Sequence, residues 1–286
     1  MNCFIKSFFI FFILASSQNI SAQSTTNPVQ AKDEKNAASL TIGSGFSSNL
    51  HYYGRTDSLK SNALIPNLSF EFGKGFFINA SFIFINNKTK SVDYTAAVAG
   101  AGYKFGAEEG LAGSIYADKF FYQNNQLVQS SQTGQAGFSL SWLNKVADIN
   151  LGSSVVFSDN TDFFTSLGLD HPFRFGKEAT VFSISPTVTA NAGSQNFTHS
   201  YLLKRNIFLF PLADEQFTQT SKRFQLLSYD ISVPMEFVHN NLSIHITPGY
   251  VLPQNIIKVE GRPDLSENAS NLFYFNIGAS ISFGNK

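Results

Sequence analysis

The last stretch of the chain, NLFYFNIGASISFGNK (residues 271–286), alternates between two kinds of side chain. Apolar residues occupy one set of alternate positions: Phe273, Phe275, Ile277, Ala279, Ile281 and Phe283. Between them lie mostly small polar residues: Tyr274, Asn276, Gly278, Ser280 and Ser282. Successive side chains of a strand point to opposite faces, so this stretch predicts a strand with one apolar and one polar face. The fold depends on which face points to the inside of the protein.

The composition is unusual for a soluble surface. Charged residues make up 14% of the chain, against roughly 25% in an average soluble domain, and phenylalanine occurs 31 times. The formal net charge is zero, which gives no reason to expect a nucleic-acid partner. The protein therefore meets its surroundings with something other than a surface rich in Lys and Glu.

The N-terminus predicts export. After Lys6 comes the apolar run SFFIFFILA (7–15), followed by a polar stretch with a small residue, Ala22, at a plausible cleavage point. The run is too short for a helix that spans a bilayer, which needs about 20 residues. We therefore predict that residues 1–22 are a cleaved signal peptide.

Two further expectations concern the mature chain. Its only cysteine, Cys3, lies in the predicted signal, so we expect no disulfide, no thiolate nucleophile and no cysteine metal ligand after cleavage. Residues 23–37 are polar, contain a proline and show no apolar period, which predicts a flexible leader. Order is expected to begin near Ala38.

From Ala38 onward the chain is a series of segments with a period of two and no sustained period of 3.6. We predict twelve strands, at residues 38–48, 63–72, 76–86, 91–105, 111–122, 132–143, 146–157, 163–175, 179–190, 225–238, 241–251 and 272–283. Each is near the 9 to 11 residues that a tilted strand needs to cross a bilayer. Pro66, Pro186 and Pro234 fall in strand interiors, where each removes a ladder donor and is expected to mark a bulge.

The connections between these segments alternate in length. Short links, such as residues 73–75 and 144–145, occur at every second position along the chain. The links between them are longer, up to the segment from about 191 to 224. Short turns at one rim and long loops at the other are typical of transmembrane β-barrels, with both termini and the tight turns in the periplasm.

The polar face of the strands identifies the inside. It consists mainly of Ser, Thr, Gly and Asn, as in 133–141, whereas a solvent-exposed sheet face should be rich in Lys, Glu and Arg. Small polar residues suit the concave interior of a barrel whose bulky residues face lipid. We predict an all-β protein: a transmembrane antiparallel up-and-down β-barrel of about twelve strands, spanning residues 38–286 as one domain.

The closing segment GASISFG (278–284), together with the signal and the polar leader, resembles the last strand of Gram-negative outer-membrane β-barrel proteins of the Bacteroidota type. The resemblance implies location in the bacterial outer membrane, with lipid around the barrel. It also implies an assembly route in which the barrel-assembly machinery reads the last strand and Phe283 serves as its terminal aromatic. Three residues follow Phe283 here, a departure from the commonest form.

Ionisable residues on or beside the small polar face are the candidates for lining the lumen. They are Glu71, Asp93, Asp118, Asp148, Asp170, Asp230 and Glu236, with His245 between Ser243 and Thr247. A charge in a barrel wall is expected to face the lumen, because facing lipid costs a few kcal/mol at mid-bilayer. Two interpretations stay open: a pore whose acidic lining favours cations or neutral solutes, and a closed lumen in which the acids are paired.

The longest loop, residues 197–224, contains the apolar run NIFLFPL (206–212). Four basic residues flank this run: Lys204, Arg205, Lys222 and Arg223. The loop could fold into the mouth and constrict it, extend the hairpin outside the membrane, or dock a partner.

No motif indicates a metal, a cofactor or a catalytic triad. The five histidines lack metal-ligand spacing, and the one adjacent His–Ser pair, His199 and Ser200, lies in a predicted loop. We therefore expect no metal, no cofactor and no enzyme. The leading interpretation is a narrow passive pore for small hydrophilic solutes. The alternatives are a closed barrel whose outer loops bind a surface partner, and a lipid hydrolase with its site on the barrel wall.

Overall fold

A computed structural model describes residues 38–57, 59–106, 110–123, 132–158, 160–177, 179–196, 223–258 and 266–284. The predicted signal (1–22) and leader (23–37) lie outside these residues, so both stay predictions. Among the described residues, none belongs to a helix that could cross a membrane.

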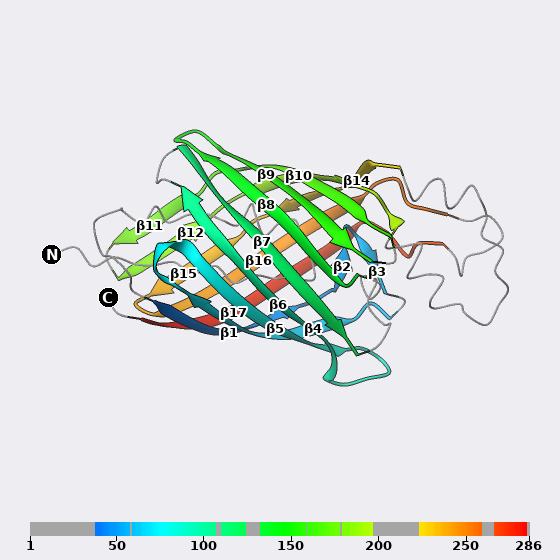
Figure 1. The fold of residues 1–286 in the computed structure, drawn as a ribbon, viewed down its shortest axis with the longest axis horizontal. Coiled ribbons are helices and arrows are strands. Elements are labelled where there is room, and N and C mark those ends of the chain that lie inside the picture. Colours follow the sequence, from blue (N-terminus) through cyan, green and yellow to red (C-terminus); the bar gives the residue numbers. More distant parts are fainter. Residues whose placement is uncertain are drawn as a thin grey trace.

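Fifteen strands form one antiparallel sheet (Figure 1). In chain order they are β1 (Ser39–Ser47), β4 (Asn62–Glu71), β5 (Phe76–Asn86), β6 (Asp93–Gly106), β7 (Gly110–Tyr122), β8 (Gly134–Leu143), β9 (Asp148–Phe157), β10 (Asp162–Asp170), β11 (Phe173–Lys177), β12 (Thr180–Ile184), β13 (Thr187–Gly193), β14 (Gln225–Ser232), β15 (Met235–His239), β16 (Leu242–Pro253) and β17 (Leu272–Gly284). A short hairpin, β2 (His51–Tyr52) and β3 (Arg55–Thr56), stands apart from this sheet. A 3-10 turn, η1 (Gly73–Gly75), links β4 to β5.

The sheet closes on itself because β17 pairs with both β16 and β1. Three barrel strands are each interrupted once, as β10/β11, β12/β13 and β14/β15, so the fifteen strands amount to twelve crossings. The predicted fold class is therefore confirmed. Both described ends of the chain, at Ala38 and Gly284, lie with the tight turns at one end of the barrel (Figure 1). We call this end periplasmic and the opposite end outer, after the orientation that the sequence predicts.

Prolines cause the three interruptions, and they lie at one level. His171 N–H donates to the Pro186 carbonyl (3.4 Å), Ser185 N–H to Pro234 (2.8 Å) and Val233 N–H to Pro248 (3.0 Å). Proline has no N–H to give to the ladder, so the strands break where these residues meet. The breaks at Pro186 and Pro234 occur where irregularity was predicted. Pro66 is paired with Ser44 of β1. On its other side, the ladder between β4 and β5 is interrupted between Leu64 and Asn67.

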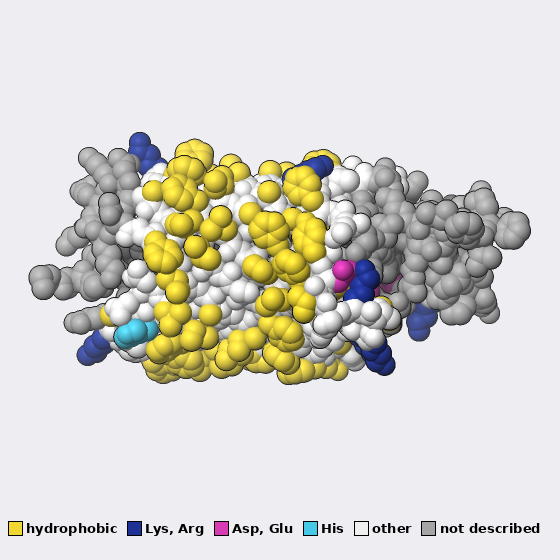
Figure 2. Space-filling model, turned by 90° about the horizontal axis from the view of Figure 1, so that it is seen from below, with side chains coloured by type: hydrophobic (Ala, Val, Ile, Leu, Met, Phe, Trp, Pro, Cys, Tyr) yellow, Lys and Arg dark blue, Asp and Glu magenta, His cyan; other side chains and the backbone are white. Residues whose placement is uncertain are grey.

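The apolar face of β17 points outward, which answers the question that its alternation raises. Phe275, Ile277 and Ile281 are 39–46% exposed, whereas Asn276 and Ser280 are 7% and 3% exposed. The same arrangement recurs around the barrel, and hydrophobic side chains form a belt between the two ends (Figure 2). Exposed aromatic residues flank the belt at both ends, with Phe72, Phe76, Phe105, Trp142, Phe173, Phe175 and Phe283 at the end of the tight turns and Phe121, Phe157, Phe163, Phe224, Tyr250 and Phe273 at the other. A lipid-facing belt flanked by aromatic residues is characteristic of transmembrane barrels.

This orientation predicts how charges on the outer face affect stability. Leu167 of β10 is outward-facing and pairs with Leu151 in the middle of β9, so Leu167→Arg should destabilise the inserted barrel by about 2–4 kcal/mol. Leu111→Arg, beside Trp142 near the periplasmic rim, should cost only about 0–1 kcal/mol. Urea-induced unfolding in lipid vesicles measures both, and equal costs at the two positions would contradict the assigned membrane depth.

Candidate channel lumen and outer plug

The inner wall of the barrel carries most of the acidic residues that the sequence predicts there. Asp118, Asp148, Asp170 and Asp230 are buried on the face opposite the lipid belt. Each accepts a hydrogen bond from a neighbour: Gln135 Nε2 to Asp118 (2.8 Å), Asn144 N–H to Asp148 (2.8 Å), Asn150 Nδ2 to Asp170 (2.5 Å) and Tyr274 OH to Asp230 (3.0 Å). Hydrogen bonds with neighbours in the wall hold these carboxylates in place.

A row of polar and ionisable residues runs along the inner wall near its periplasmic end. Directly opposed pairs on adjacent strands place Arg174, Ser183, Glu236 and His245 on one face. Elsewhere on the wall, Lys104 Nζ pairs with Glu71 Oε1 at 3.1 Å. The periplasmic half of the lumen therefore holds charges of both signs.

Glycines let these side chains lie flat along the wall. A Cβ at Gly278 would lie 2.4 Å from the ring of His245, and one at Gly249 would lie 2.3 Å from the ring of Tyr274. The two rings thus occupy the space that side chains at these positions would need. They cover the neighbouring strand instead of pointing straight at the barrel axis.

The remaining predicted site residues lie at the rims or outside the described residues. Asp93 forms an ion pair with Lys90 (2.5 Å) at the outer end of β6, where both side chains are more than a third exposed. Arg223 is exposed before β14. Lys204, Arg205 and Lys222 lie outside the described residues, so a constriction by that loop stays a prediction. Phe283 faces outward on β17, and its role in assembly is likewise untested.

The segment that does occupy the outer mouth is residues 48–61, which we call the plug. Its residues His51, Tyr52 and Tyr53 are buried. The ring of His51 lies 4.7 Å from Tyr274 of β17, while the ring of Tyr52 lies 5.8 Å from Phe164 of β10. Three crossings separate β10 from β17 in the sheet, so one short hairpin reaches both only from inside the barrel.

Aromatic packing holds the plug against one side of the wall. The ring of Tyr53 stacks on Phe164 at 5.5 Å, and the two tyrosine rings are 4.5 Å apart. The same apolar cluster includes Val156, Leu227 and Ile257. Gln132, just before β8, donates to the hydroxyl of Tyr52 (3.3 Å).

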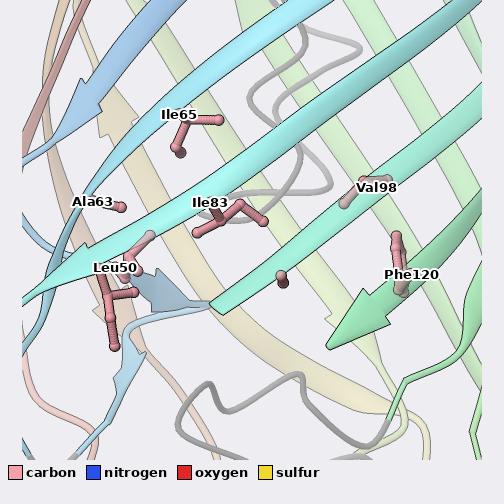
Figure 3. Packing of buried hydrophobic residues seen from close by; sticks show 8 residues of the cluster. Leu50, Ala63, Ile65, Ile83, Val98 and Phe120 are labelled. Carbon is pink, nitrogen blue, oxygen red and sulfur yellow. The ribbon is translucent and has the colours of Figure 1, made fainter. Parts of the chain in front are cut away.

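On the other side, the inward face of β4 to β7 changes from polar to apolar towards the outer end. Leu50 of the plug packs in a cluster with the wall residues Ala63, Ile65, Ile83, Ile85, Ala96, Val98 and Phe120 (Figure 3). These residues are buried, whereas Leu64 and Phe82 beside them face outward. Both faces of these four strands are therefore apolar at the outer end.

Arg55 fixes the plug through a set of interactions that we call the latch. Its guanidinium is buried and forms an ion pair with Glu267 (Nε to Oε1, 2.9 Å). It also donates to Gln195 Oε1 (2.7 Å) and to three backbone carbonyls, those of Tyr53 (3.0 Å), Leu227 (3.3 Å) and Gln254 (3.2 Å). The other oxygen of Glu267 accepts the Ile257 N–H (2.9 Å). The latch thus joins the plug to β14 and to the segments after β13 and β16.

His51 connects the plug to a lumenal carboxylate through Tyr274. Gly54 N–H donates to His51 Nδ1 (3.4 Å), and Tyr274, packed on the His51 ring, donates its hydroxyl to both oxygens of Asp230 (3.0 and 3.1 Å). Burial lowers the pKa of His51 from 6.5 to about 4, because the charged imidazolium is disfavoured away from water. His51 is therefore neutral in the plugged barrel near pH 7.

Several buried polar atoms of the inner wall have no hydrogen-bond partner among the described residues. They are Asn79 Oδ1, Asp170 Oδ2, Thr189 Oγ1, Asn191 Oδ1, Asn276 Oδ1 and Ser280 Oγ. They come from β5, β10, β13 and β17, and so from different sides of the wall. Buried polar groups in native proteins are almost always hydrogen-bonded, to protein or to water. The lumenal wall thus offers sites for water or for a solute.

Several solved structures are similar to this chain at low sequence identity. The KdgM porin in complex with disordered oligogalacturonate has a TM-score of 0.47 at 11% identity, covering 86% of this chain and 99% of that one. The NanC porin gives 0.44 at 12% identity (85% and 98%), and the COG4313 outer membrane channel from Pseudomonas putida F1 gives 0.45 at 8% (90% and 100%). No protein-family model and no curated protein matches the sequence.

The closed barrel, its lipid-facing belt and its polar inner wall define an outer-membrane β-barrel protein.

Proposed function

We propose that the protein is a narrow channel for small hydrophilic solutes, closed at its outer mouth by the plug and opened when the plug moves. The unpartnered polar atoms on the inner wall carry this proposal. A dry lumen would leave each of them without a hydrogen bond, at a cost of about 1–3 kcal/mol per group. Water in the lumen removes this cost, and a hydrated lumen is the physical requirement for passage of hydrophilic solutes.

The charges of the wall favour cations and neutral solutes. Six carboxylates lie on the inner wall below the plug, at Glu71, Asp118, Asp148, Asp170, Asp230 and Glu236. The basic side chains of Lys104 and Arg174 lie close to some of these carboxylates: Lys104 pairs with Glu71, and Arg174 lies near Asp148 and Glu236. An excess of acidic groups along a pore attracts cations and repels anions.

Reversal potential tests this selectivity. With the plug removed and a KCl gradient across a planar bilayer, we expect the potential to show cation preference. Asp230→Asn should reduce that preference, because it removes one wall carboxylate and leaves the Tyr274 hydroxyl an acceptor. Asp93→Asn, at the exposed outer rim, is the matched control and should change it little. Anion preference in the open barrel, or equal effects of the two substitutions, would overturn this assignment.

A closed barrel that presents its outer loops to a surface partner is the second candidate. The latch favours it, because a buried and fully bonded arginine holds the plug in place. A barrel that stays silent in the bilayer after release of the latch would support this candidate. The lipid-hydrolase alternative depends on His199 and Ser200, which lie outside the described residues. Lipid hydrolysis that is lost in His199→Ala would support it.

A further inference from the structure

Three inward-facing residues of β10 and β13 each carry a buried polar atom without a hydrogen-bond partner among the described residues. The atoms are Asp170 Oδ2, Thr189 Oγ1 and Asn191 Oδ1, and the residues are 4%, 2% and 3% exposed. Asp170 lies directly opposite Thr187 and so diagonal to Thr189, with a Cα separation of roughly 7–8 Å. Gly168, directly opposite Thr189, contributes no side chain between them. The three residues therefore form one patch of the inner wall, which we call the acceptor patch.

The unpartnered atoms of the acceptor patch are all able to accept hydrogen bonds. Asn150 Nδ2 donates to the other carboxylate oxygen, Asp170 Oδ1 (2.5 Å), and Asn191 Nδ2 donates to Ser228 Oγ (3.1 Å). What remains is a carboxylate oxygen, an amide oxygen and a hydroxyl group. A molecule bound at the patch therefore has to supply donors.

The charge around the acceptor patch is negative. Asp148 lies directly opposite Asp170 on β9, and Asp230 lies directly opposite Thr189 on β14. Like charges at directly opposed positions destabilise a sheet, so a bound cation would relieve the repulsion between Asp148 and Asp170. Arg174 lies near Asp148 and offsets part of this charge. A ligand with positive charge as well as donors thus matches the patch.

The acceptor patch lies directly beneath the plug. Phe164 of β10 carries the tyrosine rings of the plug and is paired with Gly193 of β13. Asn191 and then Thr189 are the next inward residues of β13 towards the periplasmic end, and Asp170 lies beyond them. A solute that enters from the periplasmic end therefore reaches the patch before it reaches the plug.

We propose that the acceptor patch binds the primary ammonium group of a small organic cation between Asp170 Oδ2 and Thr189 Oγ1. A primary ammonium group brings one positive charge and three N–H donors, and its hydrogen bond to a carboxylate is of the strong, charge-assisted kind. Asn191 lies roughly 6–7 Å further along β13 and accepts from a second donor of the same solute. The proposal rests on the channel function proposed above and deepens it, because it names the class of solute.

The probe is 1,4-diaminobutane, whose two amino groups match the spacing of Thr189 and Asn191. Saturation-transfer difference NMR measures its affinity for the folded barrel, residues 23–286, in micelles of deuterated detergent. The matched control compound carries trimethylammonium groups in place of both amino groups, so it keeps the charge and loses every N–H donor. We expect the control compound to bind at least about tenfold more weakly.

Substitutions locate the site. Asp170→Asn should weaken binding of 1,4-diaminobutane by about tenfold or more, because it removes the charge while its amide oxygen still accepts from Asn150. Thr189→Val keeps the shape of the side chain and removes the hydroxyl, so it should weaken binding by about two- to tenfold. Asp93→Asn, at the exposed outer rim, is the matched control and should leave the affinity unchanged.

The outcomes separate this site from the channel function. Equal binding of the two compounds would indicate general attraction by the wall charges and overturn the proposal. Absence of 1,4-diaminobutane binding to a barrel with intact β-sheet circular dichroism would show that the patch holds water only, and would also overturn it. Conductance of the barrel without its plug is decided independently: a silent barrel that still prefers 1,4-diaminobutane to the control compound would overturn the channel and leave the ammonium site standing.

Discussion

Replacing Arg55 with methionine is expected to turn a silent barrel into a conducting one. The substitution keeps much of the side-chain length but leaves the carboxylate of Glu267 buried without its ion-pair partner. Breaking a buried pair in this way costs about 3–5 kcal/mol, which favours plug displacement by roughly a hundredfold or more. Single-channel recording of residues 23–286 in a planar bilayer measures the change as the fraction of time that the channel conducts.

The control removes a different ion pair near the same mouth. Lys90→Met breaks the pair with Asp93, whose side chains are exposed, and exposed pairs contribute about 0–1 kcal/mol. We expect Lys90→Met to stay as silent as the unchanged protein. Conduction in Lys90→Met, or continued silence in a correctly inserted Arg55→Met barrel, would show that the latch does not hold the mouth closed.

Acidification of the outer solution is expected to open the channel through His51. Its pKa is about 4 in the plugged barrel and about 6.5 once the plug is released to water. The released form binds a proton below pH 6.5 and the plugged form does not, so the plugged state is fully favoured above about pH 6.5 and loses stability as the pH falls towards 4. At pH 5 the shift amounts to roughly 30-fold relative to pH 8.

His51→Phe separates this effect from titration of the wall carboxylates. Phenylalanine keeps an aromatic ring against Tyr274 but does not titrate. Open probability should rise between pH 8 and pH 5 in the unchanged protein and stay nearly flat in His51→Phe. The same rise in both proteins would assign the pH response to the wall instead of the plug.

The architecture of this protein is predictable because it follows from local patterns. The alternation in β17, the tight turn at residues 73–75 and the small polar inner face each depend on neighbours in sequence. Because proline has no backbone N–H, the sequence also predicts the irregularities at Pro186 and Pro234. The predicted strand at 163–175 was wrong in one respect, because the break at His171–Pro172 divides it into β10 and β11.

The plug was not predicted, for a physical reason. Its sequence resembles a polar loop, and the groups that bury it are distant in the chain: Gln195, Leu227 and Glu267 surround Arg55. Only closure of the barrel brings these groups together. The signal available in the sequence was the aromatic run HYY at residues 51–53, inside a long loop that would otherwise be hydrophilic.

The inward orientation of Ile65, Ile83 and Val98 was also not predicted from the sequence. They sit in strands whose outward residues are apolar as well, so alternation between the two faces disappears there. Such a stretch predicts a strand buried on both faces. Here lipid covers one face, and Leu50 of the plug packs against the other.

Replacing residues 48–61 with a short Gly-Ser turn and recording single channels beside the unchanged protein tests the central claim most directly. A hydrated polar lumen closed by the plug predicts a silent parent and a plug-deleted barrel with stable, cation-preferring conductance steps. A plug-deleted barrel that inserts, resists urea like the parent and still does not conduct would contradict the account, because the lumen would then be closed by the wall itself.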